Sequence, residues 1–148
     1  MKTRLLLLPV AALLLAGCNL PLIGVSSTPT PSATATARPR STATLTILQP
    51  QANAIVTQTT VHVEFRLSGG RIVAVTSKNL TRDTGHIHMS IDGRLISMNY
   101  QLSQDVSMQP FAAGPHVLQG EFVAVDHAPF NPRVITNVII EYQPPGSS

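Results

Sequence analysis

Two histidines, His86 and His88, stand two residues apart within residues 85–91. Apolar and polar residues alternate in this segment, as is typical of a half-buried β-strand, so the two imidazoles are expected to leave the same face. Two imidazoles on one face can share a metal ion, and Zn²⁺ and Cu²⁺ are ions that imidazole ligands suit. The alternative is a strand whose polar face is simply solvated.

A metal site of this kind needs a third ligand, and spacing alone does not say which residue supplies it. The candidates are His127, His116 and Asp126. Each also has a structural interpretation. His116 stands at the start of a long predicted strand. There it can form a hydrogen bond to the backbone of an upstream residue, as a tyrosine does at the equivalent corner of many β-sandwiches. Asp126 can bond loop amides, or it can orient a ligating His127, which is otherwise an exposed loop residue. His62 alternates with charged residues and is expected to be solvated.

Other chemistry has little support in the chain. The sequence contains no nucleophile elbow, no phosphate-binding glycine loop and no HExxH motif, so we expect a protein that is not an enzyme. Met89, Met98 and Met108 offer thioethers that suit copper(I), although the alternation places Met89 in the core. Cys18 is the single cysteine, which excludes an intramolecular disulfide; once it is lipidated, a Cys-ligated blue-copper centre is excluded as well.

The first residues predict export and anchoring. A short basic stretch precedes a continuous apolar run from Leu5 to Leu15, which has the length of a signal-peptide core and is too short to span a membrane. The run ends in Leu15-Ala16-Gly17-Cys18, which resembles the bacterial lipobox. The resemblance implies that residues 1–17 are a signal peptide, that Cys18 carries the lipid, and that several acyl chains hold the protein firmly to a membrane. Asn19 leaves both cell membrane and outer membrane open as the destination.

Residues 18–44 predict a tether between the lipid and a folded domain. The stretch from Ser26 to Thr44 is rich in Ser, Thr, Ala and Pro and has almost nothing to bury, which is typical of disorder. The net charge of +3 includes Lys2 and Arg4 of the signal peptide, so the mature chain is closer to neutral. With no basic cluster and no Trp, nucleic-acid binding is excluded.

Residues 45–143 predict one all-β domain, followed by a flexible tail at residues 144–148. Asp92-Gly93 is a strong hairpin signal, and no segment after Ile23 shows capped helical spacing over more than eight residues. About seven short strands in about 100 residues predict an antiparallel β-sandwich of immunoglobulin or fibronectin type, with a closed barrel as the alternative. The expected strands lie near residues 45–47, 61–67, 71–76, 86–91, 94–100, 105–108, 117–125 and 134–142.

The folded part resembles a group of bacterial secreted domains of unknown function. The matching motifs are Gly-His-x-His ending in Asp-Gly at residues 85–93, Gly-x-His-x-Leu at residues 114–118, and Asp-His-x-Pro at residues 126–129. The resemblance implies an immunoglobulin-like module of an envelope protein. Ile87 stands where some members of the group have a third histidine.

These features together predict an extracytoplasmic, lipid-anchored protein that presents a non-catalytic binding or structural module. The candidate site is a cluster of His86, His88 and His127, with His116 as a further candidate, binding Zn²⁺ or Cu²⁺. A protein- or glycan-interaction module without metal is the alternative, although the absence of Trp counts against glycan stacking. An envelope hydrolase is the weakest alternative.

Overall fold

The computed structural model describes residues 37–146, and every regular element in that range is a β-strand. The predicted signal peptide, the lipobox and Cys18 lie outside the described residues. Among the described residues, no helix has the length and apolarity to span a bilayer. The strands are β1 (Thr44–Gln49), β2 (Ala54–Val56), β3 (Thr60–Ser68), β4 (Arg71–Ile72), β5 (Thr84–Ile91), β6 (Arg94–Asn99), β7 (Ser103–Ser107), β8 (Gly114–Ala124) and β9 (Pro129–Tyr142).

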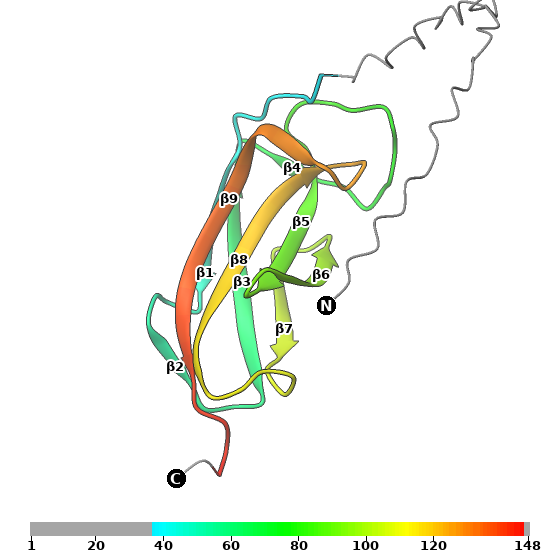
Figure 1. The fold of residues 1–148 in the computed structure, drawn as a ribbon. Helices are drawn as coiled ribbons and strands as arrows, with labels where there is room; N and C mark the ends of the chain where they lie inside the picture. The colour runs from blue at the N-terminus through cyan, green and yellow to red at the C-terminus, as the bar shows by residue number, and fades with distance from the viewer. Residues whose placement is uncertain (1–36, 147–148) are drawn as a thin grey trace, which may run out of the picture. The chain divides into compact units, whose positions relative to one another are not determined.

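The strands form two sheets, which lie one behind the other in Figure 1. The smaller sheet has the order β1-β3-β7, and the larger has the order β2-β9-β8-β5, with β4 and β6 both pairing with β5. Pairing is antiparallel except for β2 with β9 and β4 with β5. The chain crosses between the sheets in the order of immunoglobulin and fibronectin type III domains, so the predicted sandwich is confirmed and the barrel is wrong.

The core lies between the two sheets and is built by the predicted alternation. Val61, Val63 and Phe65 of β3 face the larger sheet, whose β5 contributes Ile87, Met89 and Ile91. Burying each large apolar side chain contributes about 1.5–3 kcal/mol. The sheets are in tight contact at Gly120 of β8, where an added Cβ would lie 2.4 Å from Cε1 of Phe65.

The hairpin between β5 and β6 is the predicted one. Ile91 pairs with Arg94 across the two-residue loop, and Asp92 and Gly93 have φ values of 51° and 78°. Two successive positive φ values are typical of the type I′ turn that an Asp-Gly loop favours. This turn places β6 beside β5 on the edge of the larger sheet.

Several features differ from the sequence-based expectation, among them the start of β9 at Pro129, five residues before the expected position. The short parallel strand β2 was not predicted, because three residues are too few to show a period. The strand expected over residues 71–76 is paired only at Arg71–Ile72. The domain also begins before residue 45, since Ser41, Thr42 and Ala43 all donate hydrogen bonds to the carboxylate of Asp83. Residues 38–43 are therefore part of the folded domain and not of the linker.

Candidate metal centre

His86 and His88 lie on the outer face of the larger sheet, as their spacing predicts. Their neighbours Ile87 and Met89 are completely buried in the core, so the two histidines point the opposite way. His86 is nevertheless 0% exposed, because other side chains cover it on this outer face. The predicted alternative of a freely solvated polar face therefore does not describe His86.

A tight contact between two strands fixes the position of His86. Gly85 pairs with Ala124 of β8, and an added Cβ at Gly85 would lie 1.7 Å from the carbonyl oxygen of Val123. Only glycine allows the backbones to approach this closely. The next residue, His86, thereby sits close to the end of β8, where the turn to β9 begins.

His127 comes from that turn. The amide of His127 donates to the carbonyl of Ala124 (2.9 Å), and the amide of Ala124 donates to the carbonyl of Ala128 (3.1 Å). This pattern is a three-residue hairpin loop whose last residue adopts the left-handed conformation, and φ of His127 is 65°. Glycine or asparagine favours this conformation, so a histidine held there carries a local backbone cost.

Arg38 braces this turn from the segment that precedes β1. Its guanidinium donates to both carboxylate oxygens of Asp126 (2.5 and 2.9 Å) and to the carbonyls of Ala128 and Pro129. The hydrogen bond from Arg38 keeps the pKa of Asp126 below its usual range. Asp126 thus holds the loop in shape, whereas the contact to the His127 ring comes from the Thr76 hydroxyl, 2.9 Å from Nε2.

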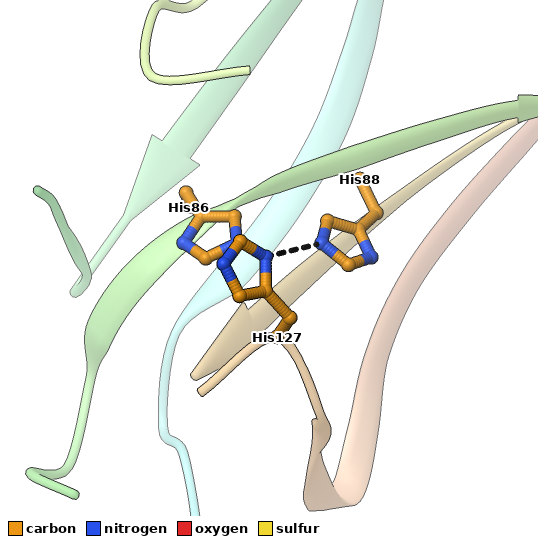
Figure 2. Close-up of side chains that lie close together, drawn as sticks. All are labelled: His86, His88 and His127. Atoms are coloured by element: carbon orange, nitrogen blue, oxygen red, sulfur yellow. Dashed lines mark hydrogen bonds between the residues drawn. The ribbon is translucent and has the colours of Figure 1, made fainter. Parts of the chain in front are cut away.

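The three imidazole rings converge, and Figure 2 shows them turned toward one another. Nδ1 of His127 lies 2.8 Å from Nε2 of His86 and 3.3 Å from Nε2 of His88. All three nitrogen atoms lie within 4.8 Å of one another. The predicted cluster of His86, His88 and His127 therefore exists, assembled from one strand and one hairpin turn of the same sheet.

Burial keeps the two strand histidines neutral at physiological pH. Burial, followed by the proximity of His127 and His88, lowers the pKa of His86 to about 4. Burial and the proximity of His127 also lower the pKa of His88, although Glu121 opposes the shift. Neutral imidazole is the form that binds a metal ion, so no proton has to be displaced from either ring near pH 7.

The hydrogen bonding of the cluster is incomplete. Nδ1 of His127 is the partner of two Nε2 atoms, but a single ring nitrogen carries either one hydrogen or one lone pair. Nδ1 of His86 is buried and has no hydrogen-bond partner. Leaving such a group unpaired costs about 1–3 kcal/mol.

One of the two nitrogen–nitrogen separations has the spacing of a tetrahedral metal site. With Zn–N distances of about 2.0–2.1 Å, two ligands of a tetrahedral site are about 3.3 Å apart. The separation between His127 and His88 matches this value at 3.3 Å, and that between His127 and His86 is shorter at 2.8 Å. A neutral His127 that donates from Nε2 to Thr76 presents its Nδ1 lone pair to the ion, which is the tautomer a ligand needs.

The other histidines lie elsewhere. His116 does not belong to the cluster, because its Nδ1 contacts Asp92 (2.6 Å) and its Nε2 contacts the carbonyl of Ala112 (2.8 Å). This upstream backbone contact is the structural role that the sequence offered as the alternative. His62 lies on β3 of the smaller sheet and pairs with Asp105. Met89 and Met108 are fully buried.

Three residues around the cluster were not found by sequence reasoning: Thr76, Arg38 and Tyr100. Thr76 ended a predicted strand, and Arg38 lay in a stretch that had the composition of a linker. The ring of Tyr100 lies 5.2 Å from that of His86 and packs edge-on against it. Nothing in their local sequence indicates these contacts, because each joins segments that are distant in the chain.

Comparison with known proteins gives distant likenesses. No protein-family model matches the chain, and no curated protein matches it. Among solved structures, the chain is similar to fibronectin(III)-like modules of Clostridium thermocellum CbhA, with 10% identity and a TM-score of 0.42 over 68% of this chain and 98% of the other. It is also similar to the PKD domain of human KIAA0319, with 11% identity and a TM-score of 0.43 over 80% and 96%.

Proposed function

We propose that this protein is a lipid-anchored, extracytoplasmic protein whose immunoglobulin-like domain binds Zn²⁺ or a copper ion through His86, His88 and His127. The observation that carries the proposal is the convergence of three imidazole nitrogens, with Nδ1 of His127 at 2.8 and 3.3 Å from the other two. Three neutral nitrogen ligands leave one coordination position open in a tetrahedral site.

A metal ion accounts for features that packing alone does not explain. His127 holds a conformation that costs a non-glycine residue about 1–2 kcal/mol. Its Nδ1 faces two nitrogens that it cannot satisfy together. An ion at the centre would accept a lone pair from each ring and relieve the crowding of three like groups. The Arg38 brace and the Thr76 contact would hold His127 in place before the ion binds.

The proposed location rests on the N-terminal sequence. An apolar run of signal-peptide length is followed directly by Leu15-Ala16-Gly17-Cys18. In this proposal, Cys18 carries the lipid, residues 19–36 span the distance from the membrane, and the domain works in the envelope. Its role there is to bind and present the ion, not to carry out a reaction.

Calorimetric titration tests the metal proposal. The full chain is purified in a nonionic detergent, stripped with a chelator and titrated with Zn²⁺ and with Cu²⁺ near pH 7. We expect one equivalent to bind tightly to the wild type, and binding to be lost in His86→Ala/His88→Ala. His62→Ala is the matched control, because His62 lies on the other sheet and should leave binding unchanged. Weak and equal uptake by all three proteins would contradict the proposal and favour a metal-free interaction module.

Membrane fractionation tests the anchor. We expect the wild type to partition with membranes and to carry fatty acid, and Cys18→Ala to be released without it. Release of an unacylated wild-type chain would contradict lipidation at Cys18, while leaving the metal proposal to its own test.

A further inference from the structure

Met98 lies beside the histidine cluster on the same face of the sheet. It is the direct cross-strand partner of His88 in the β5–β6 pair, and directly paired residues share a face. The neighbouring pair, Met89 with Ser97, faces the core, where Ser97 and the Met89 sulfur both contact Gln104. Met98 therefore points outward with His88, and it is 50% exposed.

β6 borders the cluster on the side away from the turn that contains His127. β5 lies between β8 and β6, and His86 and His88 both rise from β5. His127 reaches them from the turn after β8, as Figure 2 shows. Three ligands leave a fourth position in a tetrahedral site, and β6 is the strand next to β5 from which a side chain on this face could fill it. Tyr100 packs against His86 there, and Met98 is the neighbour of His88.

The charges around the cluster favour an ion of low charge. Glu121 is the partner of His88 on the β8 side, but both its oxygens accept from Arg133, at 2.7 and 2.6 Å. Asp126 is likewise held by Arg38. These two carboxylates are thus already compensated, and imidazole binds a metal ion in its neutral form. A monovalent ion leaves less uncompensated charge in this half-buried site than a divalent one.

We propose that Met98 is a fourth ligand and that it makes the site selective for copper(I). The inference rests on the proposed function, because it needs the three-histidine site. A thioether is a soft, neutral ligand that suits Cu(I) and adds little for Zn²⁺, and the three rotatable bonds of methionine let its sulfur swing toward the ion. The exposure of Met98 leaves it free to make this movement.

Paired affinity measurements test the inference. The detergent-solubilised full chain and its Met98→Leu variant compete for Cu(I) with a chromogenic chelator under anaerobic, reducing conditions, and for Zn²⁺ with a second chelator. We expect Met98→Leu to weaken Cu(I) binding by roughly tenfold or more and to leave Zn²⁺ binding within about twofold of wild type. Leu95→Ala removes another exposed apolar side chain of β6 and should change neither affinity.

The outcomes separate this inference from the proposed function. Unchanged Zn²⁺ binding shows that Met98→Leu is folded and that the histidine site is intact. If the wild type binds both ions and Met98→Leu binds Cu(I) equally well, Met98 is not a ligand, whereas the three-histidine site stands. If the wild type binds neither ion, the proposed function is wrong and the assignment of Met98 falls with it.

Discussion

Replacing His127 with asparagine should remove metal binding without unfolding the domain. Asparagine tolerates the left-handed conformation that His127 adopts at φ 65°, which relieves about 1–2 kcal/mol of strain. The change also removes the contacts to His86 and Thr76, each worth about 1 kcal/mol. The strain that is relieved and the contacts that are lost nearly cancel in the free energy of unfolding. A domain of about 110 residues shifts its melting temperature by about 4 °C per kcal/mol, so the metal-free variant should melt within about 4 °C of wild type.

The response to metal is where the two proteins should differ. A ligand present at 100 times its dissociation constant stabilises the folded state by about 2.7 kcal/mol, which corresponds to a rise of about 11 °C for the wild type. We expect no such rise for His127→Asn in differential scanning calorimetry at the same Zn²⁺ concentration. His62→Asn is the matched control and should respond like wild type, because its side chain is 58% exposed on the smaller sheet. A full Zn²⁺ response of His127→Asn would refute the role of His127 as a ligand. A large loss of stability without metal would instead make His127 a structural residue.

Three further predictions concern the elements that support the site. Gly85→Ala should destabilise the domain by about 3 kcal/mol or more in chemical denaturation, because its Cβ would meet the Val123 carbonyl at 1.7 Å; a loss below about 1 kcal/mol would show that β5 and β8 can separate freely. Arg38→Met should cost about 1–3 kcal/mol and weaken Zn²⁺ binding about tenfold in calorimetry, since it frees the His127 turn; unchanged affinity would make the brace irrelevant to the site. Burial lowers the pKa of His116, but hydrogen bonds to Ala112 and Asp92 outweigh it and raise the pKa above its usual value of 6.5. Its stabilisation is therefore present below pH 6.5 and lost as the pH rises through the raised folded-state value, so the melting temperature of the wild type should fall over that range more than that of His116→Gln. Parallel pH profiles would contradict this assignment.

The fold was predictable where the sequence has a clear period. The alternation in β3 and β5 predicts which face of each strand is buried, and Asp92-Gly93 predicts the hairpin that follows β5. Both signals can be read from neighbouring residues, because strand period and turn chemistry are local properties. β2 was missed because its pairing with β9 is set by the tertiary structure. Arg38 and its neighbours have the composition of a linker, and only their contacts to Asp126 and Asp83 make them part of the domain.

Two of the three histidines of the candidate site could be predicted in the same way. His86 and His88 share a face because their spacing matches the strand period. The choice of His127 over His116 could not be made, since both follow β5 at long range and only the register between β5 and β8 decides which end of the sheet each one reaches. Gly85 pairs with Ala124, which brings the turn containing His127 to His86, whereas Ile91 pairs with Leu118 at the other end, near His116.

The most direct test of the central claim is the X-ray absorption spectrum of the zinc-loaded full chain. We expect three nitrogen neighbours at about 2.0–2.1 Å with the outer-shell pattern of imidazole, and the loss of that pattern in His86→Ala/His88→Ala. A first shell of oxygen alone, or an imidazole pattern that survives in the double variant, would contradict the assignment of His86, His88 and His127 as a metal centre.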